Sequence, residues 1–353
     1  MARKKQSRPR AAPDKPLSPA ALQARMERVM REIGKLDMGD MTAEQADAYL
    51  QEQLASGRLD KIEPETPLEQ AQELVYEAWD ATGKRRVDLA RRALEISPDC
   101  ADAYIILAEE TRTPEEARDL YQKAVEAGER AIGPEGFREY EGHFWGVIET
   151  RPYMRARLEL AELLWLQGET AAAAEHLNDM LRLNPSDNQG VRYLLMACLI
   201  ESDRDQEAMA LLNRFKDDAS SGWAYDRALL AFRKSGESHR ADRALNRALE
   251  ANVFVPLYIL GLAPPPREAP DFVGIGDEAE AIDYAMTAHR SWAHQPEAAD
   301  WLARGWGAEI LGMLRTLHEG LDALEGVLDE DDEDTLDAFD TTPDDEATTQ
   351  PGS

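Results

Sequence analysis

The sequence contains very little cysteine and no long hydrophobic run. Only two cysteines occur in 353 residues, which excludes a disulfide scaffold and indicates a reducing compartment. No segment approaches the roughly 18 apolar residues that a membrane helix needs, because the longest apolar stretch, residues 191–200, is interrupted by Arg192. We therefore expect a cytoplasmic protein without a membrane span.

Basic residues are scarce relative to acidic ones. Lys and Arg together number 40 and Asp and Glu together number 69, so the net charge is −29. A charge of this sign repels phosphates, so we do not expect nucleic acid as the main partner. A regulatory protein whose basic N-terminal arm touches nucleic acid stays a weaker alternative.

The two ends of the chain carry opposite charge. Residues 1–17 contain six basic side chains and one acidic, whereas residues 319–353 contain fourteen acidic side chains and no Lys or Arg. Neither end has a periodic apolar pattern, so we expect disordered tails at 1–17 and 329–353. The acidic tail could also dock on a basic partner or on the protein's own groove.

The apolar residues follow a helical period, and no long stretch alternates as a strand would. Proline and glycine fall between the periodic segments, where helices start and stop. Thr66-Pro67-Leu68-Glu69 and Thr113-Pro114-Glu115-Glu116 each combine an N-cap, a first-position proline and a capping-box glutamate. These signals predict an all-α fold.

A pattern of about 34 residues recurs along the chain. Its clearest copy runs from residue 154 to 187, and two further copies begin at Asn188 and Gly222. Two upstream copies, around Ala93 and Ala124, have shortened turns. Small residues at fixed offsets let two antiparallel helices approach closely. We predict an all-α, right-handed tetratricopeptide-repeat superhelix (an α-α solenoid) with extra N- and C-terminal helices.

The repeat pattern divides the chain into segments. We expect N-terminal helices at 18–66, the repeat superhelix at 67–262, a Pro/Gly linker at 263–276 and C-terminal capping helices at 277–328. Residues 127–151 do not fit the repeat, and their glycines and aromatics predict an ordered insertion packed against the superhelix. Both cysteines, Cys100 and Cys198, fall on first helices, where we expect structural burial.

The first helices of this repeat class line an inner groove, which is the candidate partner-binding site. Arginine and large aromatics, which are enriched at binding hot spots, occur at its predicted positions. These positions are Arg155, Glu159, Glu162, Trp165, Gln189, Arg192, Tyr193, Trp223, Asp226, Arg227 and Arg233. We expect a protein or peptide partner whose acidic and apolar residues meet the arginines. Alternatively, these side chains pack on their own helices or form internal ion pairs.

Motifs of known chemistry are missing from the sequence. It has no HExxH, CxxC, GxSxG, P-loop or GxGxxG pattern, so we predict no catalytic, cofactor-binding or metal-binding residues. The alternative is an enzyme of unknown reaction with a site in the insertion around His143, Glu149 and Arg151. Trp145 is expected to pack there as a core residue.

Several short blocks resemble a known family. They include His143-Phe144-Trp145-Gly146, Asn184-Pro185-Ser186-Asp187, Asn252-Val253-Phe254-Val255-Pro256 and Gly276-Asp277-Glu278-Ala279. Across residues 68–303 the chain resembles the suppressor-of-tumorigenicity-seven family and its bacterial, repeat-only relatives. Eukaryotic members carry membrane segments, and their localisation is not carried over. The resemblance implies no catalytic activity and a role as a non-catalytic scaffold or adaptor.

Overall fold

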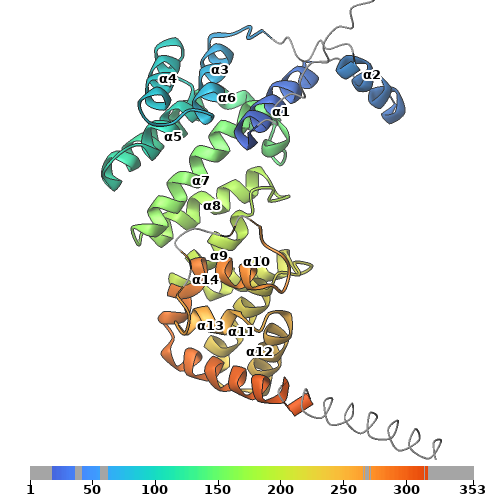
Figure 1. Cartoon of the computed structure of the whole chain (residues 1–353), viewed down its shortest axis with the longest axis vertical. Coiled ribbons are helices and arrows are strands. Elements are labelled where there is room, and N and C mark those ends of the chain that lie inside the picture. The colour runs from blue at the N-terminus through green and yellow to red at the C-terminus, as the bar shows by residue number, and fades with distance from the viewer. Residues whose placement is uncertain are drawn as a thin grey trace, which may run out of the picture. The chain divides into compact units, whose positions relative to one another are not determined.

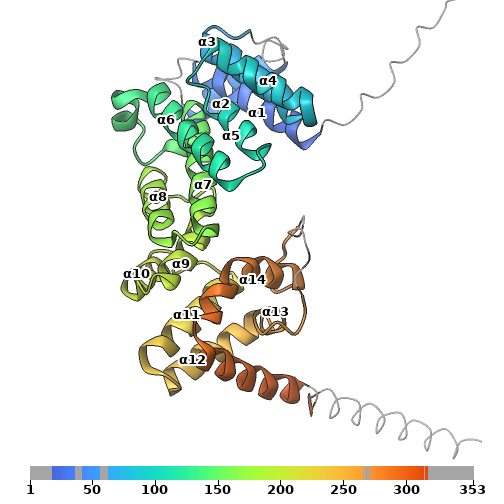
Figure 2. The same ribbon diagram turned by 90° about the vertical axis from the view of Figure 1, so that its left-hand side faces the viewer.

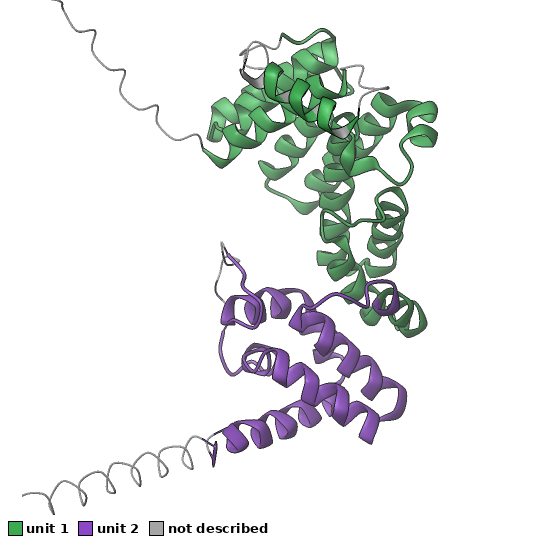
Figure 3. Ribbon diagram, turned by 90° about the vertical axis from the view of Figure 1, so that its right-hand side faces the viewer, with its two compact units in different colours: residues 1–211 green, residues 212–353 purple. Residues whose placement is uncertain are grey.

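The computed structural model describes residues 18–35, 42–55, 63–264, 266, 270, 272–313 and 315–316. All regular secondary structure within these ranges is helical, which confirms the all-α prediction. The chain forms two compact units, residues 1–211 and 212–353 (Figure 3). The predicted tails at 1–17 and 329–353 lie outside the described residues.

Unit 1 is a series of helix pairs preceded by two further helices (Figures 1 and 2). The preceding helices are α1 (Pro19–Gly34) and α2 (Ala43–Ala55). The paired helices are α3 (Pro67–Trp79) with α4 (Gly83–Ile96), α5 (Ala101–Glu109) with α6 (Pro114–Glu139), and α7 (Arg151–Leu166) with α8 (Thr170–Leu183). They are followed by α9 (Val191–Glu201) and by α10 (Asp205–Arg214), which ends beyond the unit. The predicted caps are confirmed, since the hydroxyls of Thr66 and Thr113 accept hydrogen bonds from the backbone amides of Glu69 and Glu116 at 3.1 and 3.3 Å.

Successive pairs stack through both of their helices, since α4 packs on α5, α6 on α7 and α8 on α9, and the first helices also contact one another. Helix α3 packs on α4 and also on α5, and α5 packs on α6 and also on α7, which in turn contacts α8 and α9. The helical-repeat architecture predicted from the 34-residue pattern is therefore confirmed. Among the described residues, no helix is long and apolar enough to cross a bilayer.

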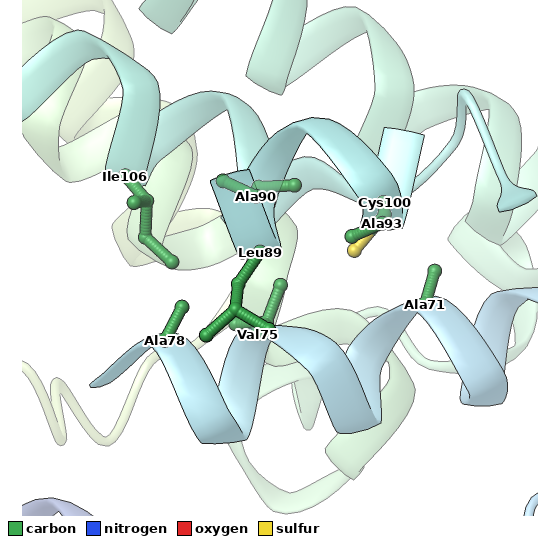
Figure 4. Packing of buried hydrophobic residues seen from close by; sticks show 9 residues of the cluster. Ala71, Val75, Ala78, Leu89, Ala90, Ala93, Cys100 and Ile106 are labelled. Carbon is green, nitrogen blue, oxygen red and sulfur yellow. The ribbon is translucent and has the colours of Figure 1, made fainter. Parts of the chain in front are cut away.

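Small residues make the close packing within the pairs possible. In the core of the first pair, alanines at 71, 78, 90, 93 and 103 surround Val75, Leu89 and Ile106 (Figure 4). Cys100 lies in the same cluster with a fully buried thiol, and Cys198 is also buried and free. The predicted structural burial of both cysteines is confirmed.

Residues 127–151 differ from the single insertion that the sequence predicts. Their first half continues α6, which kinks at Gly133 (φ 66°) just before Pro134. Gly128 lies within α6, where a larger residue would not fit, since a Cβ there would approach the Cβ of Tyr153 on α7 to 2.8 Å. The second half contains two short 3-10 turns, η2 (Phe144–Gly146) and η3 (Ile148–Thr150), which lead directly into α7. The sequence pattern treats the glycines of this segment as helix breakers, but Gly128 instead allows α6 and α7 to pack closely.

Unit 2 contains α11 (Ser221–Ser235), α12 (His239–Ala251), α13 (Val255–Ile259) and α14 (Glu278–Ala293), and residues 296–313 are helical as well. Helix α11 packs on α12 and α14, and α13 packs on α14. Before α14 the chain makes an anchored turn. The Asp277 carboxylate caps α14 by accepting from the Glu280 amide at 2.8 Å and also accepts from the Gly274 amide at 2.9 Å. The turn exposes Phe272 and Ile275, each 80% accessible.

Candidate functional site on the inner face of the helix pairs

The inner face of unit 1 is the surface formed by the first helices α3, α5, α7 and α9. Arg155 on α7 occupies a predicted groove position, but two internal carboxylates hold its guanidinium. It donates to Asp102 on α5 (Nε to Oδ1, 2.9 Å) and to Glu27 on α1 (Nη1 to Oε1, 2.7 Å). Burial alone would lower the pKa of Arg155, but the attraction of Asp102 and Glu27 outweighs it and raises the pKa. The expectation that Arg155 offers its charge to a partner is therefore wrong for this structure.

Two side chains of α3 complete the Arg155 network, which we define as Glu27, Gln72, Tyr76, Asp102 and Arg155. The Tyr76 hydroxyl donates to Glu27 Oε2 at 3.1 Å, and Gln72 Nε2 donates to Asp102 Oδ2 at 2.8 Å. Glu27 and Asp102 are each only 2% exposed. Because buried charges are costly unless they are paired, removing one member of this network leaves another unsatisfied.

Helix α1 lies across the inner face and is held mainly by charged side chains. Arg28 Nε donates to Glu73 Oε2 at 2.7 Å, and Arg31 Nη2 donates to Glu73 Oε1 at 3.2 Å. Only Ala24, Glu27 and Arg31 of this helix are buried. The sequence predicts helices before the repeats, but nothing in the repeat pattern indicates that one of them covers the groove.

A pocket of about 250 Å³ lies between α1 and the helices of the first three pairs. Glu27 and Arg31 line it from α1, and Glu69, Gln72, Asp99 and Glu149 add polar groups. Its apolar lining comes from Leu68, Tyr76, Ala101, Ala131, Ile148 and Pro152. Glu149, predicted as an insertion site residue, therefore borders this pocket.

The C-terminal half of α7 carries two carboxyl groups, of Glu159 and Glu162, whose pKa values are raised. Burial, together with the negative charges of Glu162 and Glu109, raises the pKa of Glu159 to about 7, although a hydrogen bond from Tyr121 opposes the shift. Glu162 is exposed in part, and desolvation by its neighbours raises its pKa as well. Trp165 is 9% exposed and donates from its indole Nε1 to Glu201 at 3.1 Å. Leu166, next along the helix, is 66% exposed.

The groove residues predicted around α9 make local contacts. Arg192 Nη1 donates to Asp187 Oδ2 at 2.8 Å, and its guanidinium lies 4.2 Å from the centre of the Tyr193 ring. Asp187 is buried and accepts from the amide of Val191, so it caps α9 and binds Arg192 at once. Gln189 donates weakly to the Met154 carbonyl at 3.5 Å. Tyr193 is 38% exposed.

The predicted groove residues of α11 belong to unit 2. Trp223 is 1% exposed and packs edge-on against Phe215. Asp226 is 6% exposed and accepts from the Tyr284 hydroxyl of α14 at 2.9 Å. Both residues are therefore buried packing positions, and the expectation that they line an open groove is wrong. Arg227 and Arg233 are half-buried.

In the insertion, the residues of the alternative site lie at the surface or against Trp145. His143 and Glu149 are exposed. Arg151 donates from Nε to the Trp145 carbonyl at 2.9 Å, and its guanidinium lies 5.1 Å from the Trp145 ring. Across the described ranges, no group of three His, Cys, Asp or Glu side chains is placed to hold a metal ion.

The family model described as ST7 protein matches residues 63–323, which is most of the chain. The chain belongs to the ST7 family. The Caenorhabditis elegans protein ST7 homolog is 27% identical over 278 residues, covering 66% of this chain and 50% of the relative. The rat suppressor of tumorigenicity 7 protein-like is 27% identical over 262 residues, covering 66% of this chain and 46% of the relative. The chain thus spans about half the length of the curated relatives it matches.

One solved structure also aligns with this ST7-family chain. It is the crystal structure of YrrB, described as a TPR protein with an unusual peptide-binding site. The alignment has 18% identity and a TM-score of 0.37, and it covers 56% of this chain and 90% of YrrB.

Proposed function

We propose that this ST7-family protein is a non-catalytic interaction scaffold that binds a segment of a partner protein on the inner face of α7 and α9. The observation that carries the proposal is an exposed apolar and acidic surface on these two contacting helices. Leu166 is 66% and Tyr193 38% exposed, while Glu159 and Glu162 lie on the same α7 helix. Apolar anchors beside charged groups are typical of protein-binding surfaces.

The chemistry of this surface favours a basic partner. The acidic partner expected from the sequence depends on Arg155 and Arg192, whose guanidiniums are already bonded to Asp102, Glu27 and Asp187. A lysine or arginine beside an apolar side chain would instead meet Glu159 and Glu162. Such a cation would also favour the charged form of Glu159, whose pKa of about 7 leaves it partly protonated near neutral pH.

Site-specific photo-crosslinking tests the proposal. A photo-reactive side chain placed at Leu166 should capture a defined protein in cells of the native host. The same group placed at Glu175, an exposed position on the second helix α8, serves as the matched control. Changing Glu159 and Glu162 together to Gln should abolish the capture. Equal capture from positions 166 and 175 would refute this binding surface.

A further inference from the structure

Helix α1 buries two charged side chains and leaves part of its apolar surface exposed. Its buried residues are Ala24, Glu27 and Arg31, and Val29, Met30 and Ile33 are half-buried, whereas Leu22 and Met26 are 50% and 54% exposed. A helix that belongs permanently to a core buries its apolar stripe and exposes its charges. The contacts of α1 with the inner face include several ion pairs and hydrogen bonds, whose loss is offset in part because water solvates the separated groups once the helix leaves.

The surface of α3, α5 and α7 that α1 covers is called its seat below, and the fit between the two is incomplete. Arg31 is 4% exposed and lines the 250 Å³ pocket, whose lining is largely apolar. Its Nη2 donates to Glu73, which Arg28 also binds. Its Nε, however, is buried without a hydrogen-bond partner among the described residues and lies 4.0 Å from the carboxylates of Glu32 and Glu69. A cavity of about 150 Å³ is enough to hold benzene, so an aromatic or leucine side chain would fit here better than a guanidinium.

The rest of the seat is well matched to one carboxylate. Glu27 receives hydrogen bonds from Arg155 and Tyr76, and Arg155 is held from its other side by Asp102. The seat therefore combines a specific anchor for a carboxylate with an apolar cavity one helical turn further along, since residues four apart lie on the same helix face.

We propose that the seat of α1 on α3, α5 and α7 is a helix-binding site, and that its partner is an amphipathic helix of another protein. This helix carries a carboxylate where Glu27 stands and a large apolar side chain four residues later, where Arg31 stands. Helix α1 is the resident occupant that the partner displaces. Residues 35–66 join α1 to α3 along the chain, so α1 is a tethered competitor of the partner helix. The proposal extends the proposed function to the part of the same inner face that α3, α5 and the N-terminal half of α7 form.

Peptide binding to the intact chain tests the proposal. Three fluorescent peptides carry the sequence of residues 18–35, the same sequence with Arg31→Leu, and the sequence with both Arg31→Leu and Glu27→Gln. Tethered α1 competes at high effective concentration, so the native-sequence peptide should bind weakly. We expect the Arg31→Leu peptide to bind roughly tenfold tighter or more in fluorescence anisotropy, and the added Glu27→Gln change to remove that gain.

Variants of the chain locate the site. Arg155→Gln should abolish binding of the Arg31→Leu peptide, whereas Arg204→Gln, which removes an arginine paired with Glu175 and Glu207, should leave it unchanged. The decisive peptide changes leave the chain unaltered, so an unstable Arg155 variant does not compromise the test. The proposal is overturned if the Arg31→Leu peptide fails to bind, binds no better than the native sequence, or tolerates Glu27→Gln. Crosslinking at position 166 is independent of α1, so the two proposals can fail separately.

Discussion

Asp226 is a buried carboxyl group whose ionisation opposes folding of unit 2. Burial raises its pKa from 3.8 to about 7, with a further contribution from the charge of Asp218, although the hydrogen bond from Tyr284 lowers it. Between about pH 4 and pH 7 the folded protein keeps a proton that the unfolded chain has lost. Because the folded state binds more protons, the free energy of unfolding falls as pH rises through this interval.

Replacing Asp226 by Asn should remove this pH dependence, because the amide oxygen still accepts from Tyr284 and carries no charge. We expect the slope of unfolding free energy against pH to differ from that of the native chain by up to about 1.4 kcal/mol per pH unit inside the window. Urea denaturation at pH 5, 6, 7 and 8 measures it. Asp242→Asn is the control, since exposed Asp242 also accepts from an aromatic donor, Trp301. Identical slopes for the native chain and Asp226→Asn would contradict the assignment.

Repeat register alone places Asp226 and Arg155 on the inner face but does not predict what covers them. Asp226 is buried beneath Tyr284, and Arg155 is bonded to Glu27. Both covering residues lie on helices outside the repeat pattern, far away along the chain. Side-chain burial of this kind depends on long-range packing, which a local pattern does not encode.

Local signals predict the elements themselves well. Thr66 and Thr113 start α3 and α6, and the small residues around Val75 allow the first pair to pack. The short turn η2 is different, because it contains two adjacent aromatic residues and a local pattern does not determine which of them is buried. The sequence favours Trp145, whereas the structure buries Phe144 completely and leaves Trp145 half-buried beneath Arg151.

Alanine substitutions of the two aromatic residues of η2 should show which of them contributes more to stability. Phe144 lies 5.2 Å from the Phe137 ring and 6.2 Å from the Tyr153 ring, measured between ring centres. Phe144→Ala should therefore lower the free energy of unfolding by about 3–5 kcal/mol, the usual cost of emptying a buried aromatic site. Trp145→Ala should cost clearly less, because that side chain is only half-buried. Chemical denaturation of the two variants decides the matter, and a larger loss for Trp145→Ala would reverse the assignment.

At the scale of the whole molecule, a helix from outside the repeats covers predicted groove residues in each unit. Helix α1 does so in unit 1 and α14 in unit 2. Helical repeats contact mainly their neighbours, so their inner faces are long and need either a partner or a cover. With a net charge of −29 on the chain, Arg155 is paired with internal carboxylates, and the basic partner proposed above would meet the acidic groups of α7.

The anchored turn before α14 is expected to be a protease-sensitive site in the folded protein. Phe272 is 80% exposed, whereas Trp292 of α14 is buried and donates to the hydroxyl of half-buried Tyr284 on the same helix. Brief chymotrypsin treatment of the folded chain should therefore cleave first after Phe272, which mass spectrometry of the products would show. Phe272→Ala should slow that cut.

The two fragments should still elute as one particle in gel filtration, because α14 stays packed on α11 and α13. Separation of the fragments without denaturant would mean that covalent continuity, and not packing, holds the C-terminal helices in place. If they stay together, two separately expressed halves divided at this turn should reconstitute the fold when mixed.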